Sequence, residues 1–591
     1  MIEWIHPGLL FVFGAAPIPF LRGRGRQAWL IAIPLLAIAA VASMTPGNYG
    51  VFDFAGVELL IGKVDKLSLV FAWVFSIMSL IGSIYALHVK GPEQHVAAYL
   101  YMGSALGVVF AGDWFTLLVC WEIMAFASAY LIFVGGGKAA IAAGFRYLMV
   151  HITGGVLLFG GIVLLGLETG SFLIGSMAGN GGLAFVLILV AFMINAAVPP
   201  LNAWLTDAYP EATVTGAVFL SAFTTKTAVY VLIRTFPGTE ALVWLGAVMA
   251  IYGVVYAVLE NDCRRLLAYH IVSQVGYMVV GVGIGTEMAL NGTASHAFSH
   301  IIYKGLLFMG AGAVIHMTGR RKLTELGGLY RTMPLTVTLY MVGAFAISAF
   351  PLFSGFVSKS MVIAAAAGDN RAAVTLMLTL ASSGTFLHTG LKLPYYMFFG
   401  KDCGLRPQEP PRNMLYAMGI AAVLCIGIGV FPGALYALLP HPVDFEPYTG
   451  AHVTGSLGIL FFTLLGFVVY LKALDPEPTI SLDTDWFYRR GASVLVTLTQ
   501  GPLARLESGL VGEIYEFVMR RPVLGVAGLL RNFDTRVVDF LAVGVGRLTR
   551  GFSQILRITV SGNAQHYGLF MAAGVLALLA VLFACCWIWV M

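Results

Sequence analysis

Residues 413–439 read NMLYAMGIAAVLCIGIGVFPGALYALL, and none of these 27 side chains is charged. A helix needs about 20 apolar residues to cross the hydrocarbon core of a bilayer, so this stretch predicts a transmembrane helix. A transmembrane β-barrel would instead show alternating apolar segments of about ten residues. The stretch therefore favours a helical membrane protein and excludes a barrel.

The rest of the chain has the same character. Of its 591 residues 59% are hydrophobic and only 11% are charged, whereas an ordinary soluble domain carries about 25% charged residues. At roughly 20 to 22 residues a span, this composition leaves room for about sixteen helices. Soluble enzymes, secreted modules and nucleic-acid binders are excluded, so we expect no nucleic-acid partner and interpret the net charge of +5 as a topological bias.

The apolar segments and the basic loops between them predict a topology. Spans fit near 5–21, 27–44, 67–88, 96–112, 114–134, 144–167, 183–206, 214–235, 241–259, 266–285, 291–317, 334–367, 371–400, 413–439, 452–474 and 565–590. Alternate loops hold most of the lysines and arginines, among them Arg264, Arg265, Arg320 and Arg321. The positive-inside rule then predicts a multi-pass protein of the cell inner (plasma) membrane, with both termini outside and the basic loops in the cytoplasm.

The cysteines and the first apolar segment exclude two other features. The six cysteines have no CxxC spacing and no neighbouring histidine cluster, so we expect neither a metal nor a cofactor in this chain. The first apolar segment contains Pro7, Pro17 and Pro19 and lacks a basic n-region. We therefore interpret it as the first span and not as a cleavable signal.

Two spans contain prolines at similar places, one at Val198–Pro200 and one at Pro351–Gly355. Proline removes a backbone donor and clashes with the preceding turn, so both helices should be broken there. Discontinuous helices within inverted repeats are a feature of transporters. The pattern suggests an internal repeat, although no sequence identity between the halves demonstrates it.

The character of the chain changes between about residues 475 and 564, where charged side chains become frequent. Apolar residues still recur every three or four positions, first over 503–517 and again over 533–555, and we expect Pro522 to break the helix between these stripes. The pattern predicts an amphipathic arm on the cytoplasmic side that returns to one last membrane helix. A small soluble cap and a flexible linker are the alternatives.

The chemistry should lie in ionisable residues within apolar helices, where a charge costs at least about 2.5 to 3.5 kcal/mol. Glu122, Lys226 and Lys359 are such residues. His296, His300 and Lys304 are spaced four apart in HAFSHIIYKGLLF, which places them on one helix face over roughly 12 Å. This spacing suits a proton relay, because histidine titrates near neutrality and a desolvated lysine can approach it.

Each candidate also has a structural interpretation. Glu122 could bond to a neighbouring helix, Lys359 could extend to the membrane interface, and a mid-membrane histidine such as His151 could serve packing alone. The HxxxH pair of His296 and His300 could bind a metal, but no third ligand is spaced with it.

Several motifs resemble the antiporter-like membrane subunits shared by respiratory complex I and the multi-subunit Mrp cation/proton antiporters. Residues 200–234, PLNAWLTDAYPEATVTGAVFLSAFTTKTAVYVLIR, are similar to the family's PLHxWLPDAHxxAPTPVSALLxGxxxKxGxYxLxR. Residues 261–278, NDCRRLLAYHIVSQVGYM, are similar to its sDIKRLLAYSSISQIGY, and Trp121-Glu122, HxxxHxxxK and SGFVSK also match. The tail, with SGNAQHYGLFMAAG, resembles the end of the largest complex I subunit of this type.

The resemblance implies a fold and a division of the chain. The family has two inverted five-helix repeats with flanking helices, and it moves protons along buried Glu, Lys and His residues. We therefore expect an all-α integral membrane protein of about sixteen helices. Its parts would be 1–95 (N-terminal flanking helices), 96–235 and 241–400 (repeats), 413–474 (C-terminal flanking helices), 475–564 (arm) and 565–591 (terminal helix).

Carried over by motif, the family's relay residues are Glu122, Lys226, Lys304 and Lys359, with His296 and His300 beside them. One match fails, because the family's seventh-helix lysine stands five residues before the proline of PLHxW, and here that position is Asn195. Asn202 and Arg264 depart from the motifs as well. The auxiliary candidates are His151, which could replace the missing partner of Glu122, Asn195, His388 and Lys392.

These observations predict a subunit that translocates protons, or exchanges sodium for protons, beside other membrane subunits in the lipid bilayer. We assign no catalytic chemistry to the chain itself. The arm favours a redox-driven complex I-like or hydrogenase-like pump, such as a subunit of an NADH:quinone oxidoreductase. An Mrp-type antiporter, an inorganic carbon uptake system and a non-pumping membrane anchor are the alternatives.

Overall fold

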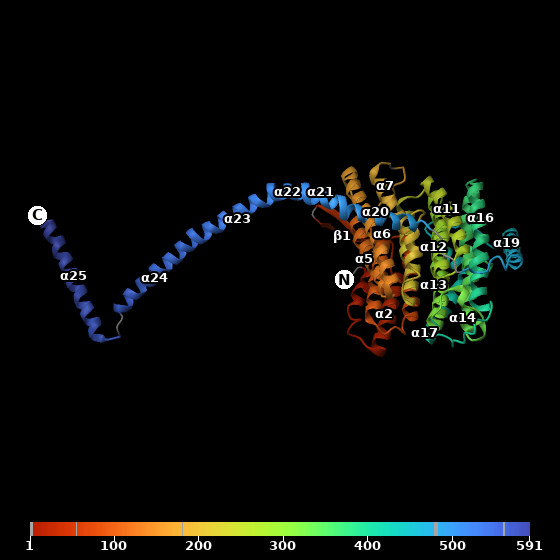
Figure 1. Cartoon of the computed structure of the whole chain (residues 1–591), viewed down its shortest axis with the longest axis horizontal. Coiled ribbons are helices and arrows are strands. Elements are labelled where there is room, and N and C mark those ends of the chain that lie inside the picture. The colour runs from red at the N-terminus through yellow and green to blue at the C-terminus, as the bar shows by residue number, and fades with distance from the viewer. Residues whose placement is uncertain (1–3, 55, 180, 478–482, 560–561, 591) are drawn as a thin grey trace. The chain divides into compact units, whose positions relative to one another are not determined.

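The computed structural model describes residues 4–590 except residues 55, 180, 478–482 and 560–561. The chain divides into two units, Met1–Trp486 and Phe487–Met591. Most of the first unit is a bundle of helices, which Figure 1 shows running side by side. Eleven helices in the described part of the chain are long and apolar enough to cross a membrane. The chain is thus a multi-pass α-helical membrane protein, while sixteen spans and the inverted repeats stay predictions.

The elements of the first unit up to its midpoint are α1 (Pro7–Ala15), α2 (Gly23–Ala42), β1 (Gly47–Phe54), β2 (Val57–Val64), α3 (Lys66–Tyr85), α4 (Pro92–Phe110), α5 (Trp114–Phe133), α6 (Gly137–Thr169), α7 (Leu183–Asn195), α8 (Ala203–Ala208), α9 (Val214–Ala222), α10 (Thr224–Thr235) and α11 (Glu240–Leu259). Its later elements are α12 (Cys263–Ile284), α13 (Glu287–Thr318), η1 (Leu323–Glu325), η2 (Leu329–Arg331), α14 (Pro334–Ile347), α15 (Ser354–Gly368), α16 (Ala372–Thr385), η3 (Phe386–Lys392), η4 (Tyr395–Phe399), α17 (Arg412–Val430), α18 (Pro432–Tyr436) and α19 (Gly450–Val469). η3 and η4 are π-helical.

Both predicted helix breaks are confirmed. The first lies between α7 and α8 and the second between α14 and α15. Two residues beyond the last helical residue, Ala197 and Ala349 adopt φ angles of 58° and 56°. A left-handed residue cannot continue a right-handed helix, so each chain turns away at this point. The matched form of the breaks supports the predicted repeat.

One element of the first unit was not expected from the sequence. β1 and β2 form an antiparallel hairpin in which Gly47 pairs with Val64. The backbone N–H of Leu60 in β2 donates to the Asp113 carboxylate at 2.9 Å, which attaches the hairpin to the start of α5. The segment is rich in aromatic and β-branched residues and too short for a span, which suits a hairpin.

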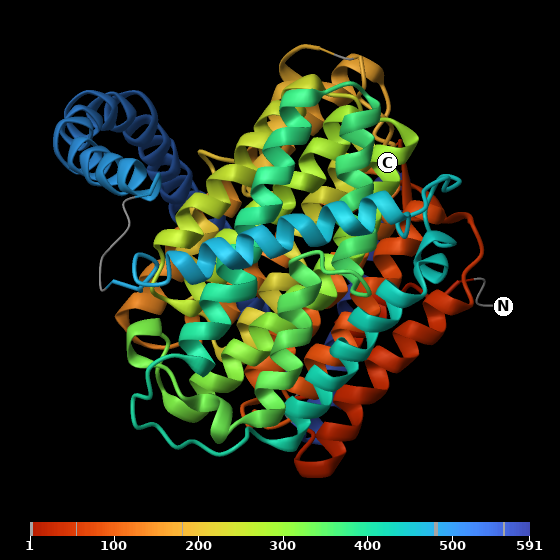
Figure 2. The same ribbon diagram turned by 90° about the vertical axis from the view of Figure 1, so that its right-hand side faces the viewer.

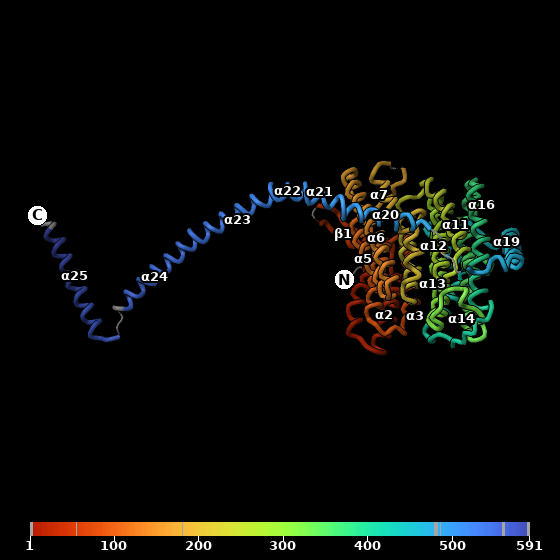
Figure 3. The backbone as a smooth tube through the Cα atoms, viewed as in Figure 1, coloured from red at the N-terminus to blue at the C-terminus, as the bar shows by residue number. Residues whose placement is uncertain are grey.

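α13 occupies the middle of the bundle (Figure 3), where it packs on α9, α12, α14, α15 and α17. Nearly all of its side chains from Ala289 to Val314 are buried. α11 and α12 pack closely through glycine, since a Cβ at Gly253 would lie 2.5 Å from the Ser273 nitrogen. Small residues let membrane helices approach in this way. α19 crosses α16 and η3 on the outside of the bundle (Figure 2).

From Asp485 to Thr559 the chain is helical in alternating α and π turns. The segments are α20 (Asp485–Leu498), η5 (Thr499–Leu503), α21 (Ala504–Leu506), η6 (Glu507–Val511), α22 (Gly512–Tyr515), η7 (Glu516–Arg520), α23 (Arg521–Phe533), η8 (Asp534–Val538) and α24 (Asp539–Thr559), and then α25 (Ala564–Val590). The predicted break at Pro522 is wrong. This proline follows the π turn η7, and the wider turn accommodates the missing donor and the ring.

Candidate functional site

The centre of the candidate site is α13, which carries His296, His300 and Lys304. All three side chains are fully buried. The rings of His296 and His300 lie 6.1 Å apart, and the ring of His300 lies 5.2 Å from that of Tyr303. The predicted stack on one helix face therefore exists, in a helix that is buried over most of its length.

Lys226 reaches this stack from a bend between α9 and α10. Its ammonium donates to the carbonyl oxygen of Ser221, in the last turn of α9, at 2.6 Å. The side chain is fully buried and lies within electrostatic range of His300 and Lys304. The Ser221 carbonyl is free to accept this bond because α9 ends at the bend near Phe223, and the last carbonyl groups of a helix have no intrahelical partner.

Lys359 lies at the other end of the stack, in α15 just after the second helix break. It donates to the carbonyl oxygen of Ile347 at 2.9 Å, and its Nζ lies 5.4 Å from the centre of the Tyr277 ring. The preceding residue, Ser358, forms a 3.2 Å hydrogen bond with Nδ1 of His296. The structure therefore joins Lys359 to the histidine stack.

Several titratable atoms of this group have no hydrogen-bond partner among the described residues: Lys304 Nζ, both ring nitrogens of His300, and His296 Nε2. Buried polar groups in proteins are nearly always satisfied by protein or by ordered water. Groups that bond to no protein atom are available to exchange protons with water or with each other. Lys304 differs in this respect from Lys226 and Lys359, each of which donates a hydrogen bond to a backbone carbonyl oxygen.

Glu122 lies apart from this buried group. It is half-buried in α5 and lines a groove of about 970 Å³ whose other walls are mostly apolar residues of α4 and α5. A Cβ on Gly155 of α6 would lie 1.8 Å from Glu122 Oε1, and one on the adjacent Gly154 would lie 3.6 Å from Asn195 Oδ1. Glu122 and Asn195 therefore approach two adjacent glycines of α6, Gly155 and Gly154 respectively. Neither amide atom of Asn195 has a partner among the described residues.

His151, also on α6, packs against aromatic side chains. Its Nδ1 lies 3.0 Å from the carbonyl oxygen of Tyr147, and its ring stacks on Tyr147 and meets Trp204 edge-on. Within the described part of the chain, no hydrogen bond links it to Glu122. These contacts support a packing role for His151.

His388 and Lys392 lie on η3, and His388 forms a hydrogen bond that the sequence analysis missed. Its Nδ1 lies 2.8 Å from Nε2 of His270, which belongs to α12. Both rings are fully buried. The sequence feature that could have indicated this pair is His270 itself, a histidine within the apolar run LLAYHIVSQ. It lies four residues before Gln274 and therefore on the same helix face.

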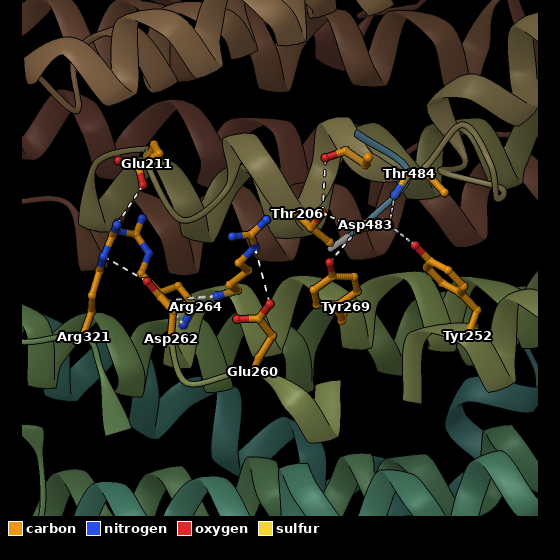
Figure 4. Close-up of polar contacts among 12 residues, drawn as sticks. Thr206, Glu211, Tyr252, Glu260, Asp262, Arg264, Tyr269, Arg321, Asp483 and Thr484 are labelled. Atoms are coloured by element: carbon orange, nitrogen blue, oxygen red, sulfur yellow. Dashed lines mark hydrogen bonds and ion pairs between the residues drawn. The ribbon is translucent and has the colours of Figure 1, made fainter. Parts of the chain in front are cut away.

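One end of the bundle carries a network of ion pairs (Figure 4). Arg321 contacts the carboxylates of Glu211 and Asp262, each at 2.9 Å, and so ties the loop after α8 to the start of α12. The Arg264 guanidinium donates to the carbonyl oxygen of Ala212 at 2.7 Å. Burial raises the pKa of the Asp262 carboxyl, although the Arg321 guanidinium opposes this shift.

A second buried carboxylate in Figure 4 comes from the segment that follows α19. Asp483 is 4% exposed and accepts hydrogen bonds from the hydroxyl groups of Tyr252, Tyr269 and Thr206, on α11, α12 and α8. The residue falls in the segment predicted as the amphipathic arm (475–564). Isolated acidic residues in a charged segment give no signal of burial, so only the fold reveals it.

Fold and site together define a multi-pass helical membrane protein that encloses a series of lysine and histidine side chains at breaks in its helices. Known proteins share these features. The family described as NADH:quinone oxidoreductase/Mrp antiporter, transmembrane, matches residues 111–387. The probable K(+)/H(+) antiporter A/B subunit of Rhizobium meliloti (strain 1021) is 32% identical over 93% of this chain and 59% of its own length.

Two solved structures have the same fold. A chain of the Mrp complex from Dietzia sp. DQ12-45-1b aligns with a TM-score of 0.64 at 23% identity, over 77% of this chain and 99% of that one. A chain of the membrane-bound sulfane sulfur reductase, an archaeal respiratory membrane complex, aligns with a TM-score of 0.69 at 23% identity, over 97% and 99%. The chain is thus similar in sequence and in fold to the antiporter-like membrane subunits that respiratory complex I and the Mrp antiporters share.

Proposed function

We propose that this chain translocates protons as one membrane component of a larger complex, in exchange for a monovalent cation such as K⁺ or Na⁺. The observation that carries the proposal is the buried series that runs from Lys226 through Lys304, His300 and His296 to Lys359. These side chains lie within hydrogen-bonding or electrostatic range of their neighbours in the series.

The physical basis is the mutual influence of like charges in a medium of low dielectric constant. Two ammonium groups a few ångströms apart disfavour each other's charged form, and burial adds to this effect. A proton that arrives at Lys226 therefore makes a proton on Lys304 easier to release, and the same holds between Lys304 and Lys359. The histidines between them can take up and pass on a proton near neutral pH.

The names of the relatives support cation exchange over proton movement alone. The Rhizobium protein, similar over 93% of this chain, is named as part of a probable K(+)/H(+) antiporter. This chain spans only 59% of that protein's length, so other parts of the exchange machinery belong to regions or subunits outside it. We therefore expect other membrane subunits as partners, and basic loops on the cytoplasmic side as the positive-inside rule predicts.

Glu122 supports the proposal that other membrane subunits pack beside this chain. Exposure of a carboxylate to lipid in the middle of a span would cost at least about 2.5 to 3.5 kcal/mol. The groove beside Glu122 is open and mostly apolar. A membrane helix of the same complex, with a cationic or amide side chain opposite Glu122, would remove this cost.

The test measures cation-dependent proton movement in everted membrane vesicles that contain the whole complex. K⁺ and Na⁺ are added in separate experiments, and a pH-sensitive dye reports the proton flux. Wild-type vesicles should respond to at least one cation, and vesicles with Lys304→Met should not, at equal amounts of assembled complex. Normal exchange by the Lys304→Met complex would overturn the proposal and favour a non-pumping membrane anchor.

A redox-driven pump is the second candidate. The fold similarity to the sulfane sulfur reductase chain extends over 97% of this chain, which includes the arm. This candidate predicts proton uptake by vesicles on addition of an electron donor without added K⁺ or Na⁺. The same vesicles and the same dye distinguish the two candidates.

A further inference from the structure

A pair of hydrogen-bonded histidines lies outside the series of relay residues. His270 on α12 and His388 on η3 are 2.8 Å apart between Nε2 and Nδ1, and both are fully buried. In a neutral pair one of these nitrogens must carry the shared hydrogen and the other must accept it. The outer nitrogens, His270 Nδ1 and His388 Nε2, make no hydrogen bond of ordinary geometry among the described residues.

The pair connects inward to Lys304. His270 lies within electrostatic range of Lys304 and Lys359. A second set of bonds runs beside it, in which the Tyr303 hydroxyl lies 3.4 Å from Gln274 Oε1 and the Gln274 amide lies 3.3 Å from Thr385 Oγ1. Gln274 is one helical turn from His270 on α12. The Tyr303–Gln274–Thr385 bonds therefore run beside the His270–His388 bond, one helical turn away along α12.

The pair also connects outward to one end of the bundle. Lys392, four residues after His388, donates to the carbonyl oxygen of Val258, near the end of α11, at 2.6 Å. It interacts electrostatically with the carboxylates of Glu260 and Asp475. Glu260 precedes α12 and lies beside the ion pairs of Figure 4, at the same end of the bundle as Arg265. The series of titratable groups therefore reaches the rim of the first unit.

The backbone around His388 is unusual as well. His388 and Lys392 both belong to the π-helical segment η3, which follows directly on α16. π turns are rare and occur frequently at functional sites, because they displace side chains from the positions that an α-helix would give them. In η3 the π turns place His388 against α12, where it bonds to His270, and Lys392 against α11, where it bonds to Val258.

We propose that His270, His388 and Lys392 form a proton branch that links Lys304 to the end of the bundle at Glu260. The branch rests on the proposed function and adds a route to it. A proton from Lys392 binds His388 at Nε2, and His388 releases its Nδ1 proton to Nε2 of His270. His270 then loses the proton on its Nδ1 to the neutral amine of Lys304, so one proton moves and each histidine ends neutral.

The experiment compares His270→Gln, His388→Gln and the double variant in everted vesicles that contain the assembled complex. An amide can still donate and accept a hydrogen bond within the pair, but it cannot take up and pass on a proton. Each single variant should lower cation-dependent proton flux by roughly tenfold or more, since a positioned proton-transfer group contributes at least that much. His6→Gln is the control, because His6 is a buried histidine whose contacts lie at the start of α1, where it caps the Gly8 nitrogen and packs on the rings of Trp4 and Phe110.

The double variant separates a shared path from two structural roles. If both histidines serve one path in series, the double variant should be no slower than the slower single variant, whereas independent effects on packing would multiply. Full flux in His270→Gln, together with no flux in Lys304→Met, would overturn the branch and leave the proposed function intact. Flux in Lys304→Met would instead overturn the proposed function itself.

A variant at the outer end of the branch covers the case in which the histidine variants fail to assemble. Lys392→Gln keeps a donor for the Val258 carbonyl and lies nearer the rim than the histidine pair. Lys392→Gln should lower the proton flux as much as the single histidine variants do. The flux should also no longer depend on the pH of the solution at the end of the bundle that carries Glu260. Unchanged flux and an unchanged pH profile in Lys392→Gln would contradict the branch.

Discussion

The ammonium group of Lys359 donates a 2.9 Å hydrogen bond to the carbonyl oxygen of Ile347, which is the last residue of the helix before the break. Lys226 bonds in the same way to Ser221 across the bend between α9 and α10. Helix ends leave carbonyl groups without partners, and these groups stabilise a buried cation. Lys304 has no such carbonyl among the described residues, so no protein acceptor there stabilises its charged form.

This difference gives the first prediction. Lys304→Met keeps the approximate shape of the side chain, so the complex should assemble, but proton flux should fall by roughly 100-fold or more because a proton-transfer group is lost. Lys304→Arg should fail as well, since a guanidinium group does not release its proton at accessible pH. Flux in everted vesicles, normalised to assembled complex, is the measurement. An active Lys304→Arg complex would show that a fixed charge is sufficient at this position.

The second prediction concerns Glu122, which the structure places in an outer groove while Asn195 takes the position of the expected lysine. An amide can bond to a carboxylate, but it cannot exchange protons as a lysine does. Glu122→Gln should therefore reduce flux much less than Lys304→Met. Both variants are compared at equal assembly, and equal losses would mean that the first half of the chain carries flux through another residue.

The third prediction concerns the second unit. Its helices expose long apolar stripes, with Leu503, Leu510 and Phe517 each more than half exposed. Such stripes are stable in a folded protein only when another surface covers them. Truncation after Trp486 should weaken co-purification of the other subunits while it leaves Asp483 and the relay intact. A truncated chain that stays fully assembled and coupled would show that the arm does not hold other subunits to this chain.

The fourth prediction tests the buried carboxylate of Asp483. Asp483→Ala would leave the hydroxyl groups of Tyr252, Tyr269 and Thr206 without their acceptor. Unsatisfied buried donors cost about 1 to 3 kcal/mol each, so the thermal midpoint of the purified complex in detergent should fall. The exposed Asp444 provides the matched control through Asp444→Ala, which should leave the midpoint unchanged. Equal midpoints for the two variants would mean that Asp483 contributes no stability.

The membrane class, both helix breaks and the histidine stack follow from the amino-acid sequence without the fold. Long uncharged stretches have one stable solution in a bilayer. Proline breaks a helix through local geometry. The positions of His296, His300 and Lys304 on one face follow from the helical period alone. These features depend on residues close together in the chain, so pattern and spacing are sufficient to predict them.

Tertiary structure alone decided the contacts between segments distant in sequence. The bond between His270 and His388 joins residues 118 positions apart, and that between Tyr269 and Asp483 joins residues 214 apart. It also decided that Glu122 faces a groove and not the buried series, because the side that a helix residue faces depends on which neighbour packs there. The continuous helix through Pro522 is a local feature that the sequence still did not reveal, since a π turn is a small change of hydrogen bonding that apolar spacing does not show.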